Sequence, residues 1–293
     1  MTPLARGVGI ALLGIGVLTC MDAVAKGVVS GELHLMQIMF TRSVIVSTVL
    51  ASLFALRGRL STLRPVRMRA SILRAAVGLL APFCFFASLR YLPLTDATVV
   101  AYNSVFVITI LSALLLGERV GAWRWSAVAV GYLGVVIALE PGGEGSALGY
   151  ALVLVASVSY ASLAVAGKWL GSSESSASLV LVFNATIGLV CLPWLPFVFR
   201  LPSVAESLGL LGFALMAVSG QWLLTDAYRR IDGSLLAPLE YTSLVWVVVL
   251  DILIWRDPPG ARTLTGAAII IAASLVVIYR ERRRALQSRP RRT

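Results

Sequence analysis

The chain has 293 residues, of which 58% are hydrophobic and 13% are charged, and its formal net charge is +11. With a mean hydropathy of +0.89, it carries more apolar surface than an aqueous fold of this length could bury. The composition excludes a soluble globular protein and predicts an integral membrane protein.

Ten apolar stretches of membrane-spanning length follow one another from Leu4 to Tyr279. As a helix, each would cross the hydrocarbon core and satisfy its backbone hydrogen bonds internally. We therefore predict an all-α integral membrane fold with ten transmembrane helices. The expected spans are residues 5–27, 34–56, 71–90, 94–117, 123–140, 148–169, 176–199, 207–228, 234–255 and 262–280.

Positive charge is concentrated in the gap after the second span, residues 57–74, and in the tail from Arg280 onward. The gaps on the opposite side carry far less of it. Because Lys and Arg near helix ends stay in the cytoplasm, the pattern predicts a multi-pass protein of the inner (plasma) membrane with both termini cytoplasmic. The charge thus reports topology within the lipid bilayer, and no nucleic-acid partner is expected.

The first two spans carry charged residues within apolar sequence, where charge is costly and usually functional. Asp22 and Lys26 are four residues apart and share a helix face, so they would either form an ion pair near the outer mouth, or Lys26 would extend to the outer interface with Asp22 as its neighbour. Arg42 lies about eight residues inside the second span and would suit a carboxylate bidentately. It would either contact substrate or hold a structural pair with Asp22 or a helix carbonyl. His34 lies at a span end, where an interfacial role is favoured over proton transfer.

The fourth span presents Tyr102 or Asn103, then Phe106, at helical spacing, which gives one face both aromatic and hydrogen-bonding groups. Glu118 and Arg119 close this span and would form part of a cytoplasmic gate or an exposed charge pair. Glycines in the fifth span, with glycine and alanines in the tenth, permit close helix contact. They would serve either a homodimer interface or packing inside one bundle.

The eighth and ninth spans supply the remaining candidate residues. Gln221 and Trp222 lie in the eighth, where tryptophan is either a ligand platform or a packing residue. In the ninth, Glu240 follows Pro238, which removes a backbone donor and frees nearby carbonyls. A bent helix beside a carboxylate, followed by Tyr241, would bind an ammonium group or a proton. The alternative is that Glu240 bonds only to a neighbouring helix.

The chain repeats itself when it is divided near residue 143. Residues 9–12 (Gly-Ile-Ala-Leu) recur as 149–152 (Gly-Tyr-Ala-Leu), and 102–104 align with 240–242. We expect one unit over 1–143, a second over 144–281 and a basic tail over 282–293. Because five spans is an odd number, the second unit enters the bilayer in the opposite orientation, which is the geometric basis of alternating access. The alternative is an ancient duplication kept only for packing.

The sequence Leu-Leu-Gly-Glu-Arg at residues 115–119, with ten spans in two five-span halves and short loops, resembles the EamA-type family of drug/metabolite transporters. Almost the whole chain takes part in the resemblance, which is greatest to the amino acid and aromatic amino acid exporters. Residues 255–259 (Trp-Arg-Asp-Pro-Pro) depart from the pattern in the second half. The resemblance implies a central cavity walled by spans 1–4 and 6–9, with spans 5 and 10 peripheral.

The expected function is a secondary transporter that exports small metabolites, most plausibly neutral or aromatic amino acids. Arg42 would meet a carboxylate, Asp22 or Glu240 an amino group, and the aromatic residues Tyr102, Trp222 and Tyr241 the side chain. A transporter of drugs or other cations, or of nucleotide-sugar-like metabolites, is the alternative within this fold. A membrane enzyme would need a reactive constellation, and no catalytic motif, metal site or cofactor-binding loop is visible. A non-transporting scaffold remains the third class.

Overall fold

The structure is a computed structural model that describes residues 3–115, 117, 122–138, 146–170, 173–230 and 242–287. Every regular element in these ranges is helical, as predicted. The α-helices are α1 (Pro3–Val29), α2 (Leu35–Leu56), α3 (Met68–Gly78), α4 (Leu80–Ser88), α5 (Leu94–Ala101), α6 (Asn103–Leu115), α7 (Ala122–Ala138), α8 (Ala147–Leu170), α9 (Ser176–Cys191), α10 (Leu195–Val198), α11 (Val204–Arg230), α13 (Thr242–Leu250) and α14 (Ala261–Gln287).

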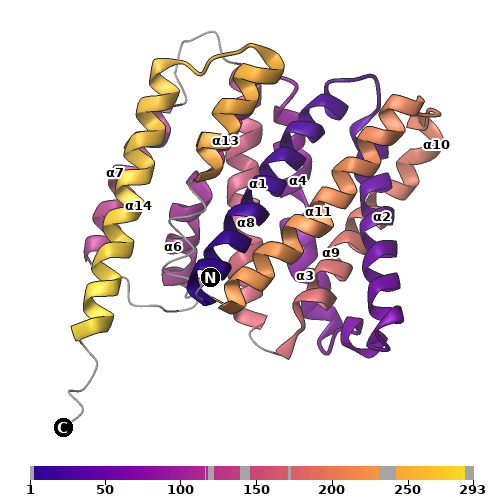
Figure 1. Ribbon diagram of the computed structural model, residues 1–293, viewed down its shortest axis with the longest axis horizontal. Helices are drawn as coiled ribbons and strands as arrows, with labels where there is room; N and C mark the ends of the chain where they lie inside the picture. The colour runs from indigo at the N-terminus through magenta and orange to yellow at the C-terminus, as the bar shows by residue number, and fades with distance from the viewer. Residues whose placement is uncertain are drawn as a thin grey trace.

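Seven helical stretches in the described residues are long and apolar enough to cross a membrane, and three shorter apolar helices lie at 129–138, 242–255 and 261–273. Together they fall on the ten expected spans in order, so the predicted multi-span helical fold is confirmed. Figure 1 shows the helices side by side in one bundle, with the start of α1 and the end of α14 toward the same face. Helix α14 continues to Gln287, beyond residue 281, where we expected the tail to begin.

The third and fourth spans are each divided into two helices. The third changes from α3 to α4 at Leu79, three residues before Pro82, whose missing N–H cannot bond to the preceding turn. The fourth is interrupted at Tyr102, between α5 and α6, although residues 94–115 contain neither proline nor glycine. Local sequence therefore explains the first break and not the second.

Packing divides the bundle into a main body and an edge. In the main body α1 packs against α11, α2 against α9, and α3 and α4 against α8. Helices α7 and α14 pack mainly against each other and form one edge of the molecule (Figure 1). The expectation that spans 5 and 10 are peripheral is thus confirmed. Their small residues serve contact within one chain, because a Cβ on Gly266 would lie 2.5 Å from the carbonyl oxygen of Gly134.

We expect Gly266→Ala to lower the thermal unfolding temperature of the protein in detergent. The new methyl group would overlap the α7 backbone and push the two edge helices apart, and such overpacking typically costs about 1–3 kcal/mol. Gly212→Ala on α11 is the matched control, since no atom lies within 4 Å of its Cβ position and alanine favours helix. Equal unfolding temperatures for the two variants would contradict the close contact of α7 with α14.

Candidate functional site

A buried ion pair joins the two halves of the chain near the C-terminal end of α1. The Lys26 Nζ lies 3.1 Å from the Asp251 Oδ1, and the two side chains are 8% and 0% exposed. The backbone N–H groups of Thr95 and Leu94, at the start of α5, donate to the same carboxylate over 2.6 and 3.3 Å. The Trp255 ring lies beneath the Lys26 ammonium, with its centroid 4.2 Å away. Both charges are therefore compensated although the site is buried.

This arrangement differs from the sequence-based expectation. The predicted pairing of Lys26 with Asp22 is wrong, because the ammonium pairs with Asp251 in the π-helix Asp251–Trp255 that follows α13, and it is too well buried to extend to a membrane interface. Asp22 and Lys26 do share a helix face, but helical spacing cannot reveal a partner 225 residues away. The available signal was charge complementarity, since Asp251 is an acidic residue inside the ninth expected span.

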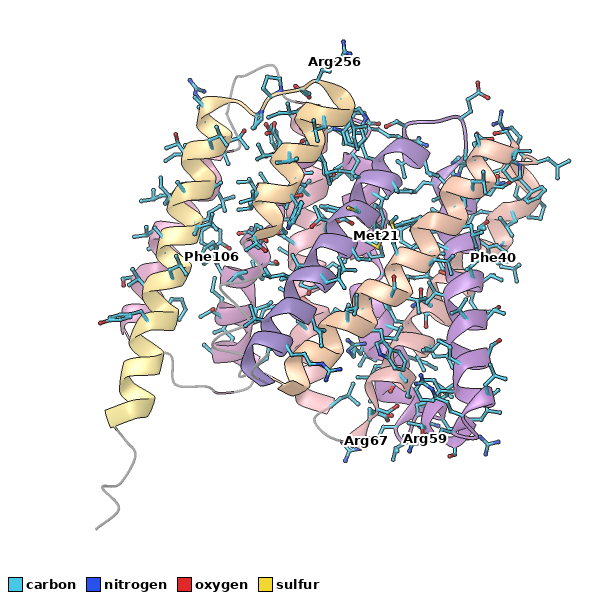
Figure 2. The ribbon with its side chains drawn as sticks, in the orientation of Figure 1. Met21, Phe40, Arg59, Arg67, Phe106 and Arg256 are labelled. Carbon is cyan, nitrogen blue, oxygen red and sulfur yellow. The ribbon has the colours of Figure 1, made fainter. Side chains whose placement is uncertain are left out.

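Arg42 lies two turns inside α2 without a partner for its Nε atom. Its guanidinium stands over the Phe213 ring of α11, with 5.1 Å from Cζ to the ring centroid, and its Nε is buried with no hydrogen-bond acceptor. Asp22 of α1 is the acidic residue predicted to pair with it, but the ion pairs formed among the described residues do not join the two. Figure 2 shows their chain neighbours Met21 and Phe40 at similar depth in the bundle.

Further buried polar atoms without hydrogen-bond partners lie next to Arg42, where α2 packs against α9. The Ser43 hydroxyl is buried without a partner, and a Cβ on Gly188 of α9 would lie 3.7 Å from the Ser43 Cβ. One turn along α9, the Asn184 amide nitrogen donates to the Val180 carbonyl over 2.9 Å, while its Oδ1 is buried and accepts no bond. Ser43 was not among the predicted site residues, although its place next to Arg42 was a usable signal.

The break in the fourth span is the second polar region. The Tyr102 hydroxyl lies 2.5 Å from the Ser243 hydroxyl of α13. The Asn103 amide nitrogen donates to the Ser157 hydroxyl of α8 over 2.8 Å, and the Asn103 Oδ1 is buried without a partner. Two of the predicted site residues therefore tie span four to spans six and nine. Discontinuous helices with free polar atoms are the arrangement that transporters use for solutes.

The other described candidates lie away from these two regions. Phe106 packs against α7, where its ring centroid is 6.0 Å from that of Tyr132, and Figure 2 places it on the side of the bundle away from Phe40. Gln221 is exposed on α11. Trp222 is 41% exposed and has Arg57 stacked over its ring at 4.8 Å.

One hollow formed by the described residues is an apolar groove between α2 and α11, with a volume of about 380 Å³. Trp222 is the predicted site residue that lines it. The groove is also lined by Val49, Leu53, Leu215, Met216, Val218 and Ser219. His34 caps α2, accepting at its Nδ1 from the Met36 N–H over 3.3 Å, which agrees with an interfacial role.

Four predicted residues lie outside the described residues, namely the gating pair Glu118 and Arg119 and the substrate-binding pair Glu240 and Tyr241. Their placement stays a prediction. Within the described ranges no cluster of His, Cys, Asp and Glu is arranged to hold a metal ion.

Comparison with solved structures supports the fold. One crystal structure superimposes with a TM-score of 0.67 at 21% identity, and the match covers 96% of this chain and 98% of that one. At this identity the similarity concerns the arrangement of the helices alone.

Comparison with curated proteins finds relatives that are named as transporters of small molecules. The pseudopaline exporter of Pseudomonas aeruginosa is 29% identical over 276 residues, which is 94% of this chain and 96% of the relative. The S-adenosylmethionine uptake transporter of Rickettsia conorii is 29% identical over 283 residues, 94% of each chain. The riboflavin transporter of Vibrio cholerae is 29% identical over 203 residues, 67% of this chain and 66% of the relative.

The family comparison assigns both halves of the chain. The sequence pattern of the EamA-like transporter family matches residues 5–139 and again residues 147–279. Each half is therefore one copy of the same unit. Together with the ten helical spans and the buried polar residues, this match shows that the chain belongs to the EamA-like transporter family.

Proposed function

We propose that the protein is a secondary transporter of small zwitterionic metabolites, amino acids above all, and that it exports them by alternating access. The observation that carries this proposal is the buried Arg42 guanidinium, which stands over the Phe213 ring and whose Nε has no acceptor among the described residues. A charge inside a bilayer costs about 2.5–3.5 kcal/mol even on the gentlest scale. A ligand with both a carboxylate and an ammonium group would compensate Arg42 and Asp22 together.

The neighbouring groups support a solute with these two charges. A planar guanidinium binds a carboxylate through two parallel hydrogen bonds. The free Asn184 Oδ1 and the Ser43 hydroxyl can accept bonds from an ammonium group, and the Phe213 ring beneath Arg42 offers an apolar surface. One relative is named as an S-adenosylmethionine uptake transporter, and S-adenosylmethionine carries the amino and carboxylate groups of methionine. The names of the relatives differ in the direction of transport, since one is named an exporter and another an uptake transporter.

Counterflow in proteoliposomes tests the proposal. Vesicles preloaded with unlabelled phenylalanine, leucine or threonine should accumulate the same labelled amino acid from outside, and protein-free vesicles should not. The lipophilic cation tetraphenylphosphonium, which has no carboxylate to meet Arg42, is the discriminating probe. Accumulation of tetraphenylphosphonium without any of the amino acids would overturn the proposal in favour of a cation transporter of the same fold.

For membrane orientation, we propose the bacterial inner membrane with both termini in the cytoplasm. Arg59 and Arg67 lie at the face toward which α1 begins and α14 ends, whereas Arg256 lies at the opposite face (Figures 1 and 2). A reporter that is active only in the cytoplasm should be active when fused after Gln287. The same reporter inserted after Ser30, in the gap between α1 and α2, should be silent. The reverse pattern would contradict the positive-inside assignment.

A further inference from the structure

At the cytoplasmic face, hydrogen bonds join two of the segments that link the helices. Glu174, between α8 and α9, is 8% exposed and accepts the backbone N–H groups of Val66 and Arg67 over 3.0 and 2.5 Å. The Ser175 hydroxyl donates to the Thr62 carbonyl over 2.6 Å. We call these contacts the inner clamp. They hold the link between the first two spans of the second repeat against the link between the second and third spans of the first repeat.

A corresponding set of contacts closes the opposite face. The Gln37 amide nitrogen donates to the Arg200 carbonyl over 2.6 Å, and the Arg200 N–H donates back to the Gln37 Oε1 over 3.0 Å. The Arg200 guanidinium also pairs with Glu32, in the gap between α1 and α2. We call these contacts the outer clamp. Here the first repeat supplies the link between its first two spans, and the second repeat supplies the link between its second and third.

The two clamps are therefore related by the inverted repeat, because the halves exchange roles from one face to the other. Between the clamps, α2 and α9 pack along their length, and Ser43 approaches Gly188 closely. Both clamps are made in the same structure. Because these contacts bridge the α2 and α9 ends at both faces, the pair is held at its two ends, as expected of a part that stays in place while other helices move.

The Lys26–Asp251 junction has no such counterpart within the described residues. It joins the outer ends of α1, α5 and α13 through one carboxylate, which accepts the ammonium and two backbone N–H groups. Each clamp has at least two hydrogen bonds to backbone groups, whereas the Lys26 ammonium alone joins α1 to the Asp251 carboxylate. Removing that one charge would free the end of α1 from the Asp251 carboxylate and leave both clamps intact, while the Arg90 guanidinium still donates to the Val29 carbonyl over 2.7 Å and α1 still packs against α11.

We propose that the α2–α9 pair, held by the two clamps, is the stationary part of the transport cycle, and that the Lys26–Asp251 junction is the outer closure that must part when the protein opens outward. This proposal rests on the proposed transport function, because the motion would serve transport. Its test needs no substrate, so failure of amino acid counterflow and failure of the proposed motion are distinguishable.

Distances between spin labels test the proposal on the full chain in nanodiscs. Cys20, Cys84 and Cys191 are first replaced by alanine, and label pairs are placed at exposed positions. Residues 30 and 257 report on the junction, 31 and 203 on the outer clamp, and 69 and 173 on the inner clamp. Lys26→Met removes the charge that closes the junction. We expect the 30–257 pair to lose its single short distance and gain a longer population, while both clamp pairs keep one unchanged narrow distance.

Two further variants keep the test decisive. Lys26→Arg retains the cation and should restore the short 30–257 distance, which a general loosening of the fold would not do. If Lys26→Met does not fold, Trp255→Leu removes the ring beneath the ammonium and should produce the same longer population to a smaller extent. A longer distance across either clamp, or an unchanged 30–257 distance in a folded variant, would overturn the proposal.

Discussion

Replacing Arg42 with alanine is expected to reduce amino acid counterflow about tenfold to a hundredfold, in protein that still inserts and folds. A hydrogen bond to a charged group contributes about 1.5–3 kcal/mol, and each 1.4 kcal/mol corresponds to a factor of ten in affinity. Because the Nε of Arg42 has no acceptor among the described residues, its removal should weaken ligand binding and cost the protein only the contact with the Phe213 ring. The variant is therefore expected to unfold at nearly the temperature of the unmodified protein.

Two variants make this result specific. Arg42→Lys keeps the charge but loses the planar fork that matches a carboxylate, so its flux should lie between that of Arg42→Ala and the unmodified protein. Arg59→Ala removes one exposed arginine from the segment between α2 and α3 and should leave the flux unchanged. Undiminished counterflow in Arg42→Ala would show that the guanidinium does not contact the solute.

Replacing Asp251 with alanine is expected to destabilise the protein more than the other changes considered. The substitution leaves the Lys26 ammonium buried without an anion and removes the acceptor of the Leu94 and Thr95 N–H groups. Breaking a buried ion pair from one side typically costs about 3–5 kcal/mol. The loss should appear as a large fall in thermal unfolding temperature in detergent and a low yield of monodisperse protein.

The double variant Lys26→Met with Asp251→Leu separates the cost of an isolated charge from that of the lost pair. Apolar replacement of both partners removes the uncompensated ammonium, so part of the stability should return. Asp257→Asn, on an exposed residue just beyond the same helix, is the control and should have little effect. A double variant no more stable than Asp251→Ala would mean that Lys26 is not the main source of the loss.

The break between α5 and α6 illustrates how far local sequence reasoning reaches. Periodicity predicts one continuous span over residues 94–117, and no proline or glycine signals an interruption. The structure bonds Tyr102 to Ser243 and Asn103 to Ser157, on two different helices. Contacts with separate elements can thus select a break that the propensities of the segment do not predict. Both side chains were nevertheless predicted as candidates, because polar groups inside apolar helices are conspicuous.

The partners of the charged residues could not be predicted from the sequence. Arg42 was recognisable as a buried charge from its depth in the second span, but its stacking on Phe213 of α11 was not. The Gln37–Arg200 and Glu174–Arg67 bonds join residues more than a hundred positions apart. Such pairs leave no periodic trace in a single sequence, since each partner keeps its own helical spacing whatever lies opposite.

The sequence by itself determined the ten spans, their helical state, the two-unit repeat and the family resemblance. It could do so because hydropathy, loop charge and repeated segments are properties of the chain read locally or against itself. The tertiary structure alone decided which charges meet, which polar atoms stay free and which helices are held together. Those outcomes depend on helix rotation and depth, and small differences in either replace one partner by another, as Lys26 shows by pairing with Asp251 rather than Asp22.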